Sequence, residues 1–160
     1  MNLENEAYRA AVRWHGDQMY GDKPYEFHLQ AVRDTLVEFG VIQDYMLACA
    51  WLHDTLEDTD YPVREMAKGF GPEITQIVFC VSGFGRNRAE RAQDLYYKLD
   101  MFETRDPYIL KAADRISNMR QSIGTPMAEM YRKEHNLFMD VMGDNIGLAM
   151  IDELNRLARK

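Results

Sequence analysis

The chain has 160 residues and a mass of 18.7 kDa, which is enough for one domain with a single sizeable hydrophobic core. Hydrophobic residues make up 46% of the sequence and charged residues 28%, so the composition is not that of a disordered chain. The formal net charge of −7 repels a polyphosphate backbone and argues against non-specific binding of nucleic acids. An anionic ligand would therefore have to meet a metal ion or a local basic patch.

Cysteine content and hydropathy give an expectation for the cellular compartment. Cys49 and Cys80 each lie in an apolar segment, and two thiols cannot form the framework of a disulfide-rich secreted domain. The first six residues include Glu4 and Glu6 and no apolar run, and no stretch approaches the roughly 18 consecutive apolar residues of a membrane span. We expect a cytoplasmic protein that has no membrane partner.

Apolar residues recur at helical spacing along the chain, as in Ala31, Val32, Thr35 and Leu36, and no segment shows the alternation of a strand. Glycine and proline divide the sequence into helix-sized pieces with short connections. The predicted helices cover residues 3–20, 26–39, 44–59, 62–69, 72–82, 87–104, 107–123, 126–142 and 146–159. This pattern predicts an all-α, compact single-domain fold over residues 1–160.

The predicted helix 44–59 ends in a cluster of one imidazole and three carboxylates, formed by His53, Asp54, Glu57 and Asp58. On a continuous helix His53 lies one turn before Glu57 and Asp54 one turn before Asp58, so each pair shares a face. Unpaired acids at this spacing repel one another. A divalent cation removes the repulsion, because imidazole and carboxylate groups are suitable ligands. The alternative is a set of solvated acids at a helix end.

Two residues on other predicted helices can complete a metal site. His28 begins an amphipathic helix, and Asp114 follows two alanines in an apolar segment. A buried aspartate is costly unless its charge is paired or coordinated. The alternatives are a hydrogen-bonded core histidine at His28 and a salt bridge from Asp114 to Lys111 or Arg115.

Three sequence blocks, in this order, carry a family resemblance. They are GDKPY at 21–25 before His28, AWLHDTLEDT at 50–59, and KAADRISNMR at 111–120. Over residues 7–120 the chain resembles the HD-domain phosphohydrolases, and among them the hydrolase domain of the RelA/SpoT alarmone enzymes and their short stand-alone relatives. The resemblance implies a helical HD-domain fold, on which we expect helices 126–159 to pack.

The resemblance also implies a site. It implies one divalent metal ion, usually Mn²⁺, held by His28, His53, Asp54 and Asp114. It implies that Glu57 and Asp58 orient or deprotonate a water molecule, which attacks the 3′-phosphate of guanosine tetra- or pentaphosphate and releases pyrophosphate. Asn118 matches a substrate-contacting position, with a hydrogen bond between helices as the alternative. Lys23 is a turn lysine for which a phosphate-facing role is the second interpretation.

The expected function is therefore a metal-dependent (p)ppGpp 3′-pyrophosphohydrolase, whose partner is a small-molecule nucleotide and not a nucleic-acid polymer. Alternatives are hydrolysis of another nucleotide, such as the 2′-phosphate of NADPH, an adenosine alarmone or a nucleoside monophosphate, and nucleotide binding without catalysis. Arg86, Arg88 and Arg91 form either a phosphate clamp or the exposed start of a helix, and they are left out of the predicted site. The 11 methionines fit core filling or a homo-oligomer interface.

Overall fold

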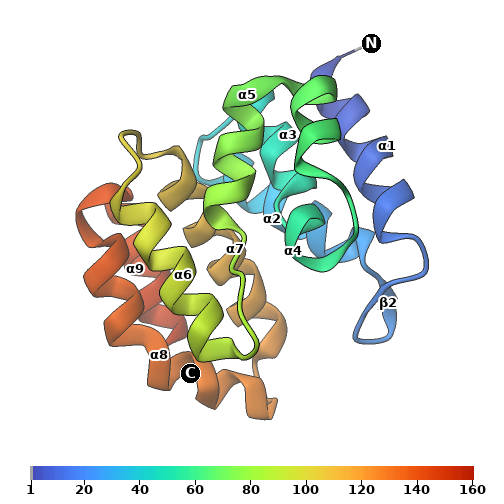
Figure 1. Cartoon of the computed structure of the whole chain (residues 1–160). Coiled ribbons are helices and arrows are strands. Elements are labelled where there is room, and N and C mark those ends of the chain that lie inside the picture. The colour runs from blue at the N-terminus through green and yellow to red at the C-terminus, as the bar shows by residue number, and fades with distance from the viewer. Residues whose placement is uncertain (1) are drawn as a thin grey trace.

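The structure is a computed structural model, and it describes residues 2–160 (Figure 1). The elements in chain order are α1 (Leu3–His15), β1 (Met19–Tyr20), β2 (Lys23–Pro24), α2 (Glu26–Glu38), α3 (Asp44–Leu52), α4 (Thr55–Asp58), α5 (Val63–Val81), α6 (Arg88–Asp100), α7 (Asp106–Ser122), α8 (Pro126–Met142), the 3₁₀ turn η1 (Gly143–Asn145) and α9 (Leu148–Leu157). The predicted all-α fold class is confirmed. Within residues 2–160, no helix has the length and apolar character needed to cross a membrane.

Local sequence explains where several helices begin. Asn2 and Asn87 each accept a hydrogen bond from the backbone N–H three residues later, at 2.8 and 3.0 Å, and so cap α1 and α6. Pro107 and Pro126 lie in the first turns of α7 and α8, where a missing N–H breaks no helical hydrogen bond. The start of α8 at residue 126 is the predicted one.

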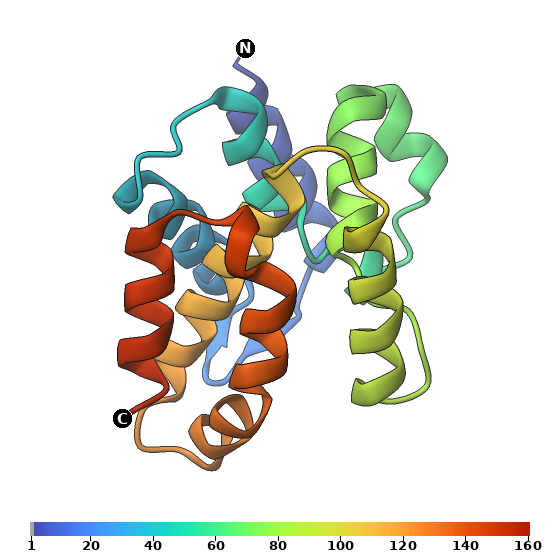
Figure 2. The same cartoon turned by 90° about the vertical axis from the view of Figure 1, so that its left-hand side faces the viewer.

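The helix α7 is central to the packing. It contacts α2, α3, α5, α8 and α9, and Figure 2 shows it running behind α8 and α9. Its residues Leu110, Ala112, Ala113 and Ile116 are fully buried, and Asp114 among them is only 5% exposed. This position places Asp114 inside the molecule, where a charge needs a partner.

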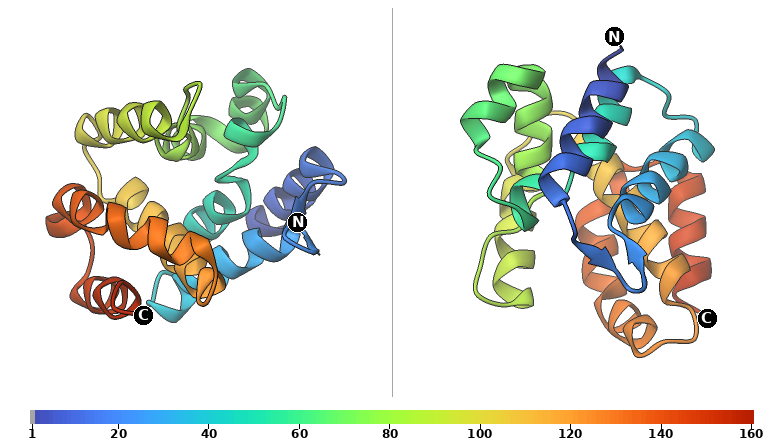
Figure 3. Two further views of the ribbon diagram at one scale, coloured as in Figure 1. Left: turned by 90° about the horizontal axis from the view of Figure 1, so that it is seen from below. Right: turned by 90° about the vertical axis from the view of Figure 1, so that its right-hand side faces the viewer.

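The predicted helix 3–20 is wrong at its C-terminal end. The helix stops at His15 because Gly16 has φ = 52°, a conformation that only glycine adopts without steric strain. The chain then forms a short antiparallel hairpin in which Met19 pairs with Pro24 (Figure 3, right). The expectation of no strand is also wrong here, because two-residue strands are too short for an alternating pattern to be visible.

The predicted helix 44–59 is divided in the structure. α3 ends at Leu52 and α4 begins at Thr55, with the backbone of Asp54 at φ = −97° and ψ = −5° between them. The prediction that His53 and Glu57 share one face of a continuous helix is therefore wrong. The interruption directs the two side chains differently, so that His53 lies beside Asp54 whereas Glu57 accepts a hydrogen bond from the backbone N–H of Gly83.

The predicted boundary between helices 62–69 and 72–82 corresponds to a kink in α5. Gly71 has φ = 82° and ψ = 168°, and Pro72 follows it, so α5 consists of two helical segments. Proline cannot donate the helical hydrogen bond at this point, and glycine accepts the left-handed φ. The predicted helix 87–104 is shorter in the structure and ends at Asp100.

Gly83 lets the loop after α5 lie close against α6. A Cβ atom at this position would lie 2.6 Å from the backbone oxygen of Arg91. Gly83→Ala is expected to lower the free energy of unfolding by about 1–3 kcal/mol, as measured by urea denaturation. Gly143→Ala is the control, because its Cβ would meet no atom within 4 Å. Equal stability of the two variants would contradict the assigned contact.

Candidate functional site

The structure brings together the four residues predicted to bind a metal. His28 lies in the first turn of α2, His53 follows α3, Asp54 precedes α4, and Asp114 lies on α7. The Nε2 atoms of the two histidines are 3.2 Å apart. Asp54 Oδ2 lies 3.3 and 3.0 Å from these two atoms, and Asp114 Oδ1 lies 3.4 and 3.6 Å from them. We call this group the His/Asp cluster.

The His/Asp cluster has the donor set and the spacing that a divalent cation requires. Neighbouring ligands at about 2.1 Å from an octahedral ion lie about 3 Å from each other, which is close to the distances found here. His53 Nδ1 lies 2.8 Å from the backbone oxygen of Ala50. An N–H at Nδ1 donated to this carbonyl leaves the lone pair of Nε2 directed into the cluster. The residues present therefore fit a divalent metal ion.

Electrostatics favour a cation in the cluster. Although burial lowers the pKa of an imidazole, Asp54 and Asp114 hold the pKa of His53 well above its ordinary value. Although burial raises the pKa of a carboxyl group, His53 holds the pKa of Asp54, and Lys111 that of Asp114, well below the ordinary value. The carboxylates of Asp54 and Asp114 are therefore ionised inside the protein, where they attract a cation.

The β1–β2 hairpin and the residue after it hold the cluster from one side. Tyr25 donates its hydroxyl to Asp54 Oδ2 at 2.6 Å. The ring of Tyr20 stacks on the ring of His28, with centroids 4.8 Å apart and planes 9° from parallel. Sequence reasoning gave these tyrosines no role, although Tyr25 belongs to one of the blocks that carried the resemblance. The hairpin therefore helps to fix the orientation of two predicted ligands.

Tyr25→Phe is expected to weaken Mn²⁺ binding by about 10-fold or more, because Asp54 loses the hydrogen bond that orients its carboxylate. The measurement is titration of the metal-free protein with Mn²⁺ in a calorimeter. Tyr97→Phe is the matched control, since Tyr97 is 66% exposed. Equal Mn²⁺ affinity in the two variants would show that the Tyr25 hydroxyl does not support the site.

The two predicted substrate contacts have different surroundings. Asn118 Nδ2 donates to Asp114 Oδ1 at 2.6 Å, and its Oδ1 accepts the Tyr20 hydroxyl at 2.7 Å, so it connects α7 to the hairpin. Lys23 is exposed on β2, with its Nζ 3.8 Å from the ring centroid of Phe27. Contacts of either residue with a substrate remain predictions.

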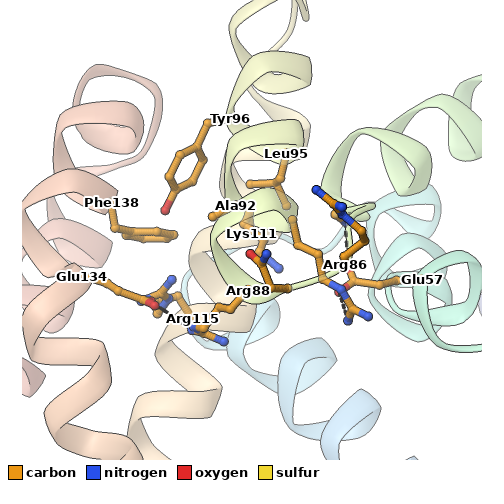
Figure 4. A pocket seen from close by; sticks show the side chains of 13 residues that line it. Glu57, Arg86, Arg88, Ala92, Leu95, Tyr96, Lys111, Arg115, Glu134 and Phe138 are labelled. Atoms are coloured by element: carbon orange, nitrogen blue, oxygen red, sulfur yellow. Dashed lines mark hydrogen bonds and ion pairs between the residues drawn. The ribbon is translucent and has the colours of Figure 1, made fainter.

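A cavity of about 240 Å³ is lined by residues of α4, α6, α7 and α8 and of the loop before α6 (Figure 4). It is connected to the His/Asp cluster through one residue. Lys111 links the two, because it lines the cavity and donates to Asp114 Oδ2 at 2.8 Å. The charged residues on the wall are mostly basic, and those that the structure describes are Arg86, Arg88, Arg91, Lys111, Arg115, Glu57 and Glu134. A protein of negative net charge thus gathers five basic side chains around one cavity.

The predicted catalytic pair is divided between two environments. Glu57 lines the cavity, and its Oε2 accepts the backbone N–H of Gly83 at 2.7 Å. Asp58 lies on the hairpin side, where its Oδ2 accepts from the side-chain amide of Gln18 at 3.0 Å. Gln18 Oε1 in turn lies 2.8 Å from Nδ1 of the buried His15. Gln18 and His15 were not predicted to act near the site.

The arginines are the main part of the site that sequence reasoning left out. Arg86, Arg88 and Arg91 formed a visible basic stretch, and the structure places all three on the cavity wall. Arg115 and Lys111 were considered only as partners of Asp114. Their position beside the arginines of α6 depends on helix packing, which the sequence pattern does not specify.

Comparison with known proteins shows which family the chain belongs to. No protein-family model matches the chain. A GTP pyrophosphokinase from Streptomyces coelicolor is 36% identical over 119 residues, which cover 71% of this chain and 14% of that protein. A guanosine-3′,5′-bis(diphosphate) 3′-pyrophosphohydrolase from Aquifex aeolicus is 35% identical over 119 residues, which cover 71% of this chain and 17% of that protein. The chain belongs to the RelA/SpoT family. It spans less than a fifth of the length of these two relatives.

A solved structure supports the fold assignment over nearly the whole chain. It is that of a metazoan ortholog of SpoT, a protein that hydrolyses ppGpp and plays a role in starvation responses. Its TM-score against this chain is 0.82 at 24% sequence identity, covering 99% of this chain and 95% of that one. The HD-domain fold that the sequence resemblance implied for this chain is therefore confirmed.

Proposed function

We propose that the chain is a metal-dependent hydrolase that removes pyrophosphate from the 3′ position of guanosine tetra- or pentaphosphate. The observation that carries the proposal is the position of the His/Asp cluster next to a basic cavity. The cluster fits a cation and the cavity fits a ligand with several phosphate charges. The 3′-pyrophosphohydrolase among the relatives favours a guanosine alarmone as that ligand.

We propose Mn²⁺ as the ion, held by His28, His53, Asp54 and Asp114, because the family resemblance implies this metal and the imidazole and carboxylate donors are compatible with it. The bound ion would supply polarisation of a phosphoryl oxygen and a lower pKa for a water molecule. The two aspartates would balance its double positive charge, and Lys111 donates to Asp114 Oδ2 at 2.8 Å while Asp114 Oδ1 faces the two histidines.

Glu57 is the group that we propose to accept the proton of the attacking water. Burial raises the pKa of Glu57, which makes its carboxylate a stronger base than an exposed one. The Gly83 N–H holds Oε2 at 2.7 Å, while Oε1 lies 3.7 Å from the guanidinium of Arg91. Asp58 is proposed to orient the water from the hairpin side, where Gln18 fixes its carboxylate.

The arginines of the cavity are proposed to hold the phosphate groups of the substrate. A guanidinium donates two parallel hydrogen bonds to a phosphate, and several of them neutralise the charge that the departing pyrophosphate carries. The proposal retains Lys23 and Asn118 as contacts to the nucleotide. It also includes a cytoplasmic location, with which the buried free thiols of Cys49 and Cys80 are compatible.

The deciding experiment is product identification. The Mn²⁺-loaded protein is incubated with guanosine tetraphosphate, and the products are separated by anion-exchange chromatography and identified by ³¹P NMR. We expect GDP and pyrophosphate, and no turnover after treatment with a chelator. Release of inorganic phosphate would contradict the reaction, whereas cleavage of NADPH but not of the tetraphosphate would contradict the substrate. Binding without any product would indicate a non-catalytic module.

A further inference from the structure

Glu134 faces the cavity from α8, and in Figure 4 it lies on the opposite side of the view from Glu57. Its Oε1 accepts from Nε of Arg88 at 2.6 Å, and its Oε2 accepts from Nη2 of the same residue at 2.9 Å. Oε2 also accepts from Nη1 of Arg115 at 3.1 Å. One carboxylate therefore engages two of the arginines on the cavity wall.

The contacts of Glu134 are those that a phosphate group would make. A carboxylate and a phosphate each present two oxygens that can accept parallel hydrogen bonds from one guanidinium. Arg115 is held in place by the rings of Tyr131 and Phe138, whose centroids lie 4.9 and 4.3 Å from its guanidinium carbon. Because these rings fix the arginine independently of Glu134, loss of the carboxylate would leave its donors directed at the same place.

The negative charge of Glu134 affects the two arginines that it contacts. Although burial alone raises the pKa of Glu134, the hydrogen bonds from Arg88 and the charge of Arg115 lower it, so the carboxylate is ionised at neutral pH. The other cations of the wall have different partners: Arg86 pairs with Glu90, Arg91 with Glu57, and Lys111 with Asp114. Glu134 thus reduces the positive potential at Arg88 and Arg115 in particular.

We infer that Glu134 is an internal counter-ion, which a diphosphate group must displace from Arg88 and Arg115 when it enters the cavity. A diphosphate carries more negative charge than a single carboxylate and offers more acceptor oxygens, whereas a monophosphate has a smaller advantage. Glu134 therefore makes the cavity select diphosphates over monophosphates. The inference rests on the proposed function only in that the diphosphate belongs to the substrate.

The test is the affinity of metal-free protein for inorganic pyrophosphate and inorganic phosphate, measured by isothermal titration calorimetry at low and high salt. Glu134→Gln is expected to bind pyrophosphate about 10-fold more tightly than the wild type, because the competing charge is gone. The preference of this variant for pyrophosphate over phosphate is expected to be lower than that of the wild type. The gain in pyrophosphate affinity is expected to be smaller at high salt. Adding Arg88→Gln to this variant is expected to abolish the gain.

Glu129→Gln is the control, because Glu129 lies on the same helix but is exposed and pairs with Lys133 at 2.9 Å. Its pyrophosphate affinity is expected to stay within about twofold of the wild type. Glu134→Asp serves if the glutamine variant does not fold, since the shorter side chain keeps the charge but cannot span both arginines. A smaller gain in affinity is expected for it.

Unchanged or weaker pyrophosphate binding in folded Glu134→Gln, or in Glu134→Asp where that variant is used, would overturn the inference, because Glu134 would then be a support for the arginines. Circular dichroism melting curves establish that each variant is folded. The assay needs neither a metal nor turnover. Tighter pyrophosphate binding in the variant, together with no hydrolysis of guanosine tetraphosphate by the wild type, would retain the role of Glu134 and reject the proposed function.

Discussion

Asp114→Asn is expected to reduce hydrolysis of guanosine tetraphosphate by about 1000-fold or more, equivalent to about 4 kcal/mol of transition-state stabilisation. Asp114 is buried on the central helix α7 and faces both histidines of the His/Asp cluster through Oδ1. Asparagine has nearly the same shape but lacks the charge that balances a cation. It also removes the negative partner of Lys111, whose Nζ donates to Oδ2 at 2.8 Å.

The same substitution is expected to abolish Mn²⁺ binding, measured by calorimetric titration, and to lower the unfolding temperature, because a buried ion pair loses one member. Asp152→Asn is the matched control, since Asp152 is exposed on α9. If the Asp114 variant does not fold, His53→Gln replaces it in the assay. Retained Mn²⁺ affinity and turnover in a folded variant would show that the cluster is not the metal centre.

The sequence was sufficient for the fold class and for the ligand candidates because both depend on local patterns. Apolar residues at helical spacing identified the helices, and a proline at residue 126 marked the start of α8. Asp54 in the acidic cluster after Leu52, and Asp114 between apolar residues of α7, each stood out in its own sequence segment. Their convergence in space was an expectation from resemblance, and the structure brings their side chains to within hydrogen-bonding distances.

What the sequence could not provide depends on contacts between distant residues. The break at Asp54 separates His53 from Glu57, and helical periodicity cannot detect a two-residue interruption. Glu134 reads in the sequence as one of several charged residues on the solvated side of a helix. It joins the cavity because α8 packs on α7 and places its carboxylate against an arginine 46 positions away.

Glu57→Gln is expected to lower kcat by about 100- to 1000-fold, the range by which a positioned proton acceptor contributes to catalysis. The amide is nearly isosteric with the carboxylate, and its oxygen can still accept the N–H of Gly83 that now lies 2.7 Å from Oε2. The fold and the His/Asp cluster should therefore be preserved. What is lost is the capacity to take a proton from water, so KM and Mn²⁺ affinity are expected to change by less than about threefold.

Steady-state kinetics with guanosine tetraphosphate, run with Mn²⁺ titration of the same preparation, separates proton transfer from ion binding. Glu65→Gln is the control, because Glu65 is exposed and pairs with Lys68 at 2.9 Å. Asp58→Asn gives the internal comparison, since Gln18 holds Asp58 on the hairpin side of the cluster. A larger fall in kcat for Asp58→Asn than for Glu57→Gln would assign proton transfer to Asp58. In that case the raised pKa of Glu57 would reflect only its buried place beside the basic cavity.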